Sequence, residues 1–130
     1  MKKLLVLLFS TIILPISVYA SDVYFCSDDG LTGFDPRQNF EQKNYSPQNF
    51  KVMVDFKNEY IISEDLYFDK DIPSKCIFED IVSNALYCIS PLGTTFSINK
   101  INLSFIRSVM FNAIDYQDDI GIGYGSCQKF

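Results

Sequence analysis

The sequence contains no histidine, and this absence excludes several kinds of catalytic site. Without an imidazole, neither a Ser-His-Asp triad nor a Cys-His nucleophile pair can be built. Zinc, iron and copper sites lose their commonest ligand, and the cysteines include no C-x-x-C pair. A Gly-Lys-Ser/Thr phosphate loop is also missing. The sequence therefore predicts a protein with no metal and no cofactor.

The N-terminal segment resembles an export signal. Two lysines precede an apolar run at residues 4–16, and small or compact residues follow at 18–20. This pattern predicts a signal peptide at residues 1–20 and a single mature domain at residues 21–130, in the periplasm or secreted. A retained membrane anchor is the alternative, because the run is only slightly shorter than a spanning helix. Pro15 favours cleavage, so we expect no membrane span in the mature chain.

Basic residues are outnumbered by acidic ones. The chain has eleven basic and sixteen acidic residues, and two of the lysines lie in the signal segment, so the mature formal charge is −7. An acidic surface without a basic cluster argues against nucleic acid and anionic lipid as partners. It is compatible with a cationic protein partner or a small ligand, and also with solubility alone.

The even number of cysteines predicts two disulfides. Sequence alone leaves three pairings open, and we favour Cys76–Cys88 with Cys26–Cys127. Opposed positions in a hairpin share a constant sum of residue numbers, so a Cys76–Cys88 pair would also oppose Phe78 and Leu86. The second bond would join the first and last strands.

Short apolar runs separated by turn residues predict an all-β, mainly antiparallel fold. We expect a first strand at 22–26, a hairpin at 49–63, a short strand at 66–68, a central meander at 76–107 and a last strand at 120–127. About eight strands with a link between the chain ends indicate a small up-and-down barrel or a closed sandwich.

Two segments leave alternatives. Residues 27–48 are rich in turn residues and read as loop or edge structure, in which residues 31–34 form an extra strand or the segment folds across an opening of the domain. For residues 99–115 we prefer a tight turn at Asn99-Lys100 that pairs Ile98 with Ile101, although the same residues could form a short amphipathic helix. That turn would also pair Phe96 with Leu103.

Glycine occupies every second position of the last strand, at Gly121, Gly123 and Gly125. This alternation leaves one face of the strand bare, and it is typical of sharp coiling, a bulge or the close approach of another backbone. A small barrel needs such a bend to close.

Aromatic residues are abundant, and they carry the main functional hypothesis. The mature chain has eleven Phe and seven Tyr, more than so small a core can hide. We expect a recognition surface because Tyr87 faces away from the core and the 27–48 segment supplies further side chains, namely Phe34, Arg37, Phe40 and Tyr45. The alternative is that these aromatics cap the ends of a barrel.

Paired carboxylates are the remaining catalytic candidates, because a glycosidase can work with two acids alone. The pairs are Asp28-Asp29, Glu64-Asp65, Asp69 with Asp71, Glu79-Asp80 and Asp118-Asp119. Each pair lies beside turn residues, where solvated acids are ordinary. A carboxylate-dependent hydrolase is therefore the less favoured alternative to a module without catalytic activity.

Three stretches resemble the periplasmic inhibitors of c-type lysozyme: Tyr24-Phe25-Cys26, the segment SPLGTTF at 90–96, and the strand carrying Cys127. The resemblance implies an eight-stranded barrel and an inhibitory loop made by a serine, a glycine and an aromatic, here Ser90, Gly93 and Phe96. Phenylalanine replaces the usual tyrosine, and the family's second motif around the last cysteine is not recovered. Cys76 and Cys88 are additional to the family pattern. An exported binding module is thus our main expectation, and a lysozyme inhibitor the alternative.

Overall fold

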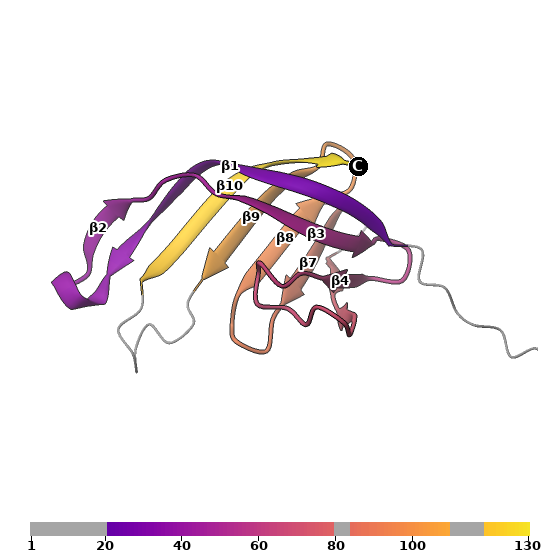
Figure 1. Ribbon diagram of the computed structural model, residues 1–130, viewed down its shortest axis with the longest axis horizontal. Helices are drawn as coiled ribbons and strands as arrows, with labels where there is room; N and C mark the ends of the chain where they lie inside the picture. Colours follow the sequence, from indigo (N-terminus) through magenta and orange to yellow (C-terminus); the bar gives the residue numbers. More distant parts are fainter. Residues whose placement is uncertain (1–20, 80–83, 110–118) are drawn as a thin grey trace, which may run out of the picture.

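The computed structural model describes residues 21–79, 84–109 and 119–130, with only the backbone at 78 and 79. Within these residues ten strands form one antiparallel sheet, which confirms the all-β prediction (Figure 1). No helix in the same residues has the length and apolar composition needed to cross a membrane. The strands are β1 (Asp22–Asp35), β2 (Glu41–Asn44), β3 (Asn49–Asp55), β4 (Tyr60–Ile62), β5 (Ser74–Lys75), β6 (Ile77–Glu79), β7 (Ala85–Ile89), β8 (Thr95–Asn99), β9 (Ser104–Val109) and β10 (Ile120–Lys129), and a short 3-10 helix η1 spans Pro36–Gln38.

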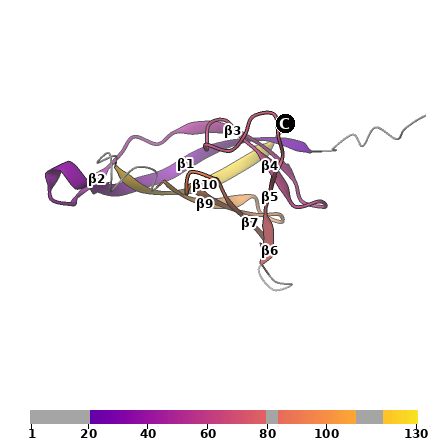
Figure 2. The ribbon, with the colours of Figure 1, turned by 90° about the horizontal axis from the view of Figure 1, so that it is seen from below.

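The sheet curls into a nearly closed barrel. Its order is β5-β4-β3-β1-β10-β9-β8-β7-β6, with β2 paired to β1 alone. The two end strands β5 and β6 follow each other in the chain with only Cys76 between them (Figure 2). The Cys76 N–H donates to Glu59 O at 2.8 Å, and its sulfur is bonded to Cys88 of β7. If β5 and β6 are counted as one interrupted strand, the barrel has eight, and Cys76 is the seam where its edges meet.

Both predicted disulfides are confirmed. Cys26–Cys127 joins β1 to β10, where the two residues are directly paired, and Cys76–Cys88 joins the seam to β7. The predicted pairing of Phe78 with Leu86 is also present in the β6–β7 register. Covalent links between neighbouring strands fix these registers and remove conformations from the unfolded chain, a stabilisation of roughly 3–5 kcal/mol per bond in the chain-entropy account.

Of the two alternatives left open for residues 27–48, the extra strand at 31–34 is confirmed. Strand β1 continues to Asp35, so the extra strand expected at 31–34 is part of it. A β-bulge between Asp28 and Gly30 shifts the register by one residue and exchanges the inner and outer faces of the strand. Because the alternation changes phase there, the sequence pattern hides the continuity. Beyond the bulge, residues 30–45 form an arm of β1, η1 and β2 that projects to the left in Figure 1.

Two other details of the predicted strands need correction. The hairpin at 49–63 is confirmed as β3 and β4. Residues 66–68, predicted as a strand, form a turn instead, and Leu66 and Phe68 are buried there as part of the core. Tyr67 between them has a φ of 59°, which is incompatible with an extended strand.

The end of the central meander is a strand, but with another register than predicted. Residues 104–109 form β9, and the remaining part of the alternative helix, 110–115, lies outside the described residues. Ile98 pairs with Phe105 and Phe96 with Arg107, not with Ile101 and Leu103. The Asn99 side chain accepts hydrogen bonds from the N–H groups of Ile101 and Asn102, and this asparagine turn lengthens the loop. The shift is by an even number of residues, so Phe105 still faces the core.

The core is centred on three aromatic rings. Phe50 packs edge-on against Phe96 and Phe105, with centroids 6.0 and 5.1 Å apart, and Phe96 lies 5.7 Å from Phe105. The rings come from β3, β8 and β9, so they connect the two sides of the barrel. Phe96 is fully buried, at 0 % exposed.

The glycines of β10 line the inside of the barrel, while Ile122 and Tyr124 point outward. A Cβ at Gly125 would lie 2.0 Å from the Ser27 carbonyl oxygen, which confirms the expected close approach of a second backbone. A Cβ at Gly123 would lie 2.9 Å from Asp28 Oδ1 and 3.2 Å from Arg107 Nε. Glycine is therefore the residue that leaves room for these groups.

A matched pair of substitutions tests this crowding. We expect G123A to destabilise the fold by about 1–3 kcal/mol, because the new methyl group overlaps buried polar atoms. G121A is the control, since a Cβ there meets nothing closer than 3.8 Å, and alanine lowers the entropy of the unfolded chain. Urea unfolding of the disulfide-bonded variants measures both effects. Equal stability of G121A and G123A would contradict the expectation.

Candidate functional site

The most distinctive local feature is the bulge in β1, because it places two residues, Asp29 and Gly30, on the outer face where a regular strand has one. Asp28 is opposite Gly125 and Gly30 is opposite Tyr124, so Asp29 is the extra residue. Asp28 is buried inside the barrel, whereas Asp29 is exposed on the outer face. Bulges commonly redirect side chains in this way.

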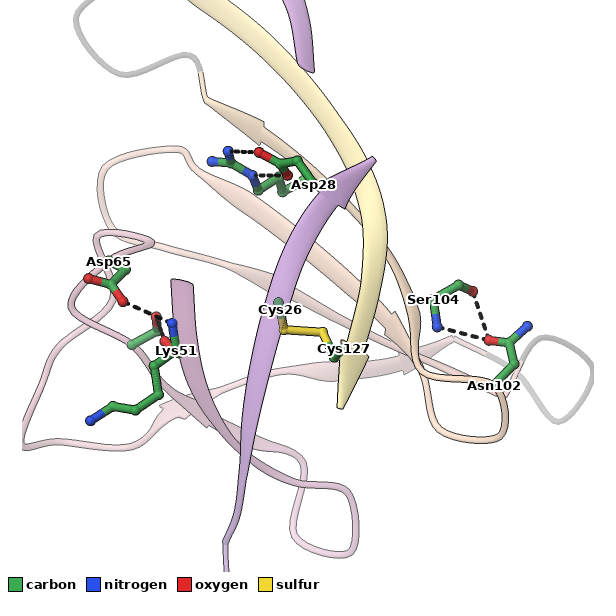
Figure 3. The surroundings of a disulfide bond; sticks show 9 residues. Cys26, Asp28, Lys51, Asp65, Asn102, Ser104 and Cys127 are labelled. Carbon is green, nitrogen blue, oxygen red and sulfur yellow. Dashed lines mark hydrogen bonds and ion pairs between the residues drawn. A yellow bond between two sulfur atoms is a disulfide. The ribbon is translucent and has the colours of Figure 1, made fainter. Parts of the chain in front are cut away.

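Inside the barrel, Asp28 forms a two-point ion pair with Arg107 of β9. Arg107 Nε donates to Asp28 Oδ1 at 3.0 Å and Nη2 donates to Oδ2 at 2.6 Å. The Asp28 side chain is 0 % exposed and the Arg107 side chain 5 %. Figure 3 shows Asp28 further along β1 than the Cys26–Cys127 disulfide. The pair thus joins β1 to β9 across the intervening β10.

Gln48 completes this buried network. Its backbone N–H donates to Asp28 Oδ2 at 3.0 Å, and its side-chain oxygen accepts from Arg107 Nη2 at 2.9 Å. The Asp28 N–H in turn donates to the Gln48 carbonyl at 3.0 Å. The guanidinium also lies 5.2 Å above the Phe50 ring. Such hydrogen bonds offset the large desolvation cost of two buried charges, so both partners are needed together.

On the outer face, apolar side chains are grouped around Tyr124. Tyr124 is 57 % exposed, and Ile106, directly opposite on β9, is 60 % exposed. Ile122 follows at the next outward position of β10 and is 51 % exposed. We call Ile106, Ile122 and Tyr124 the outer apolar face. A contiguous group of exposed apolar side chains is a candidate interaction surface.

Two shallow hollows flank Tyr124, with volumes of about 550 and 400 Å³. Asp29 and Tyr124 line both of them. The first extends over β7, β8 and β9, and the second over the arm. Other outward side chains in them are Ser97, Ser104 and Ile106 in the first and Thr32, Gln42 and Asn44 in the second. Among the described lining residues there is no lysine or arginine.

Four of the residues predicted to form the recognition surface lie on the arm. Phe34 and Phe40 are exposed there. Arg37 donates to Asp35 and to Asp119, both at 3.0 Å, and the Tyr45 hydroxyl donates to Asp119 at 2.8 Å. Arg37 and Tyr45 therefore converge on Asp119, close to the start of β10, and hold the arm to that strand.

Asp35 is the buried centre of the arm. It accepts hydrogen bonds from the Lys43 ammonium and the Arg37 guanidinium, which hold the pKa of Asp35 below its usual value of 3.8. Burial and the hydrogen bond to Asp119 raise the pKa of Tyr45 to about 12. Each cation of the arm is thus engaged with a carboxylate, which leaves the arm without an obvious anion-binding site.

The other predicted surface residues lie apart from the arm, and two of them, Ser90 and Phe96, are not on the surface. Tyr87 points outward from β7 and is half-buried. Ser90 is buried in the turn after β7, where its hydroxyl oxygen accepts from the Thr94 N–H at 3.0 Å, and Gly93 adopts a φ of 84°. Phe96 is a correction: it faces inward on β8 and belongs to the core. The turn therefore cannot present the aromatic that the lysozyme-inhibitor resemblance requires.

The paired carboxylates do not converge where the structure describes them. Asp28 and Asp29 lie on opposite faces of β1. Asp65 accepts from the Lys51 N–H at 2.9 Å (Figure 3), and Asp69 accepts from the N–H groups of Asp71 and Ile72. These acids cap backbone groups. Glu79-Asp80 and Asp118-Asp119 fall partly outside the described residues, which contain no group of three or more metal-ligating side chains.

Sequence reasoning missed the two central features, Asp28 with Arg107 inside and Asp29 with Tyr124 outside. A signal for the first was present, because period-two alternation from Phe105 places Arg107 on the inner face. The glycines at alternate positions of β10 likewise imply that the Tyr124 side chain points to the other face of the strand. No signal located the bulge.

The fold and these contacts define a small, disulfide-bonded, nearly closed antiparallel barrel with a projecting arm. No protein-family model, curated protein sequence or solved structure matches the chain. The functional argument therefore rests on the side chains of the chain itself.

A double-mutant cycle tests the buried network. D28N and R107M should each destabilise the fold by about 3–5 kcal/mol, because each leaves the partner charged group buried without its counterpart. The double variant should be more stable than the sum predicts, by about 1–3 kcal/mol. Urea unfolding gives the three values. Strict additivity would show that Asp28 and Arg107 do not act as a unit.

The Asp35 cluster predicts a pH dependence. Because the pKa of Asp35 is lowered in the folded state, its contribution to stability is complete above the unfolded value of about 3.9. It is lost as the pH falls below that value and through the lower folded pKa. Unfolding free energies measured from pH 6 to pH 2 should fall less steeply below pH 4 in D35N than in the wild type. Parallel curves would contradict this role.

Proposed function

We propose that this protein is an exported binding module, in the periplasm or secreted, whose recognition surface is the outer apolar face. The observation that carries the proposal is the inverted composition of β10. Its inward positions from 121 to 125 are all glycines, and its outward positions include Ile122 and Tyr124. A solvent-facing strand normally places polar residues outward. The inversion is explained if the outer face is covered by a partner.

The face is held rigidly, which favours binding because little order has to be created on association. The Cys26–Cys127 disulfide joins β1 and β10 next to it. The Asp28–Arg107 pair fixes β1 to β9 from the inside. Tyr124 and Ile106 are thus presented on strands that are clamped on both sides.

The partner we propose is a basic protein. The mature domain carries a formal charge of −7, which accelerates encounter with a cationic surface and disfavours anionic ones. A c-type lysozyme, the alternative drawn from the sequence, is one such partner. It would have to bind the outer apolar face, because Phe96 of the Ser90–Phe96 turn is buried.

The proposal is tested by comparing three immobilised proteins in an extract of the native envelope: wild type, the double variant I106S/Y124S, and I89S. Ile89 is 52 % exposed on β7, so I89S controls for the loss of an exposed isoleucine outside the proposed face. We expect basic proteins that are retained by wild type and I89S and bind the double variant at least about tenfold more weakly, as for interface hot spots.

The test includes purified c-type lysozyme, whose lysis of cell walls wild type should slow if lysozyme is the partner. Thermal unfolding confirms that the double variant is folded. If the double variant retains the same proteins in the same amounts as wild type, or if wild type retains nothing, the proposal is wrong.

A further inference from the structure

We propose that Asp29 and Tyr124 form a subsite that receives one cationic side chain, a lysine ammonium or an arginine guanidinium, of the basic partner. This inference rests on the proposed function, because it assigns a chemical group to the same face. It adds what the apolar contacts alone do not specify, namely the charge that the partner must place there.

The two side chains are brought together by Gly30, which follows Asp29 in the bulge and pairs with Tyr124 across the strands. A Cβ at Gly30 would lie 2.7 Å from Tyr124 Cε1 and 3.0 Å from its hydroxyl oxygen. The phenol end of Tyr124 therefore rests over the glycine, and Asp29, the residue before it, lines the same two hollows as Tyr124. The rest of the ring remains open, since the residue is 57 % exposed.

Asp29 differs from its neighbour in its charge balance. Asp28 is neutralised by Arg107, at 2.6 and 3.0 Å. Among the described residues Asp29 forms no ion pair, and no lysine or arginine lines either hollow beside it. The Asp29 carboxylate, beside the outer apolar face, thus has no cation from its own chain in the described structure. A cation from a partner would complete it.

The chemistry has a counterpart elsewhere on this molecule. Lys75 lies 5.1 Å above the Tyr60 ring, and its ammonium is 2.9 Å from Glu59. There a tyrosine and an adjacent acid hold an ammonium supplied by the same chain. Tyr124 and Asp29 are the same two kinds of side chain, but no lysine of the described residues lines the hollows beside them. An aromatic ring attracts a cation through its negative face, and the attraction grows when the partner excludes water.

The rigid inner network explains how the subsite is kept in place. The Asp28 N–H and carboxylate are both bonded to the Gln48 backbone. The bulge is therefore fixed immediately before Asp29, and the carboxylate leaves the sheet at a defined position.

The test is an NMR titration of the exported, disulfide-bonded protein with tetralysine, using tetralysine acetylated on every amine as the uncharged probe. We expect tetralysine to shift the amide signals of Gly30 and Tyr124, and the acetylated peptide not to do so. D29N and Y124L should each weaken binding by about two- to fivefold, whereas Y124F should retain it because the ring is preserved. G30A, which displaces the ring without changing either partner, should also weaken it.

E64Q is the matched control, because it removes the same charge from the exposed loop after β4. Equal effects of D29N and E64Q, or equal binding of the two peptides, would overturn the subsite. If I106S/Y124S has lost its partner in the envelope extract while D29N behaves as E64Q, the face binds by apolar contact and only the subsite is wrong. If the double variant keeps every protein that wild type captures, the proposed function fails as well.

Discussion

The buried ion pair between Asp28 and Arg107 is the constraint on which the rest of this structure depends. Two charges inside a small barrel are tolerated only when they are closely and fully hydrogen-bonded. Gln48 adds a backbone N–H donor for Asp28 and a side-chain oxygen acceptor for Arg107. Room for the pair exists because Gly123 has no side chain. Because the inward positions 121, 123 and 125 of β10 are glycines, the large side chains in this part of the strand lie outside. In this part of the barrel the polar Asp28–Arg107 pair thus lies inside and the outer apolar face lies outside.

Much of the fold could be predicted because it follows from local rules. Alternation identified the β3–β4 hairpin, and constant-sum pairing identified the Cys76–Cys88 bond together with the register of Phe78 and Leu86. The predictions of register and strand length were wrong where a single residue changes the local geometry. Asn99 lengthens the turn before β9 through its own hydrogen bonds, and the bulge in β1 reverses the faces in mid-strand. Neither event leaves a periodic trace in the sequence.

The candidate site was less predictable than the fold, for the same physical reason. Arg37 and Tyr45 do converge, on Asp119, but they fasten the arm, and Phe96 completes the core. Asp29 and Tyr124 are ninety-five positions apart and meet only through the pairing of Gly30 with Tyr124. Such a site depends on long-range register, which hydrophobic patterns constrain to within two residues at best.

The pairing that places Cys26 next to Cys127 also affects the order of folding. Strand β1 has β10 as its longest neighbour, and the two are separated by about a hundred residues of chain. The barrel wall cannot close until the last strand is present, and the loop closed by this pairing is among the longest that the chain allows. While the chain is being made, β1 can pair with β2 and β3, but its pairing with β10 has to wait for the last strand. Such a topology makes completion of the barrel, and formation of this disulfide, a late step in folding.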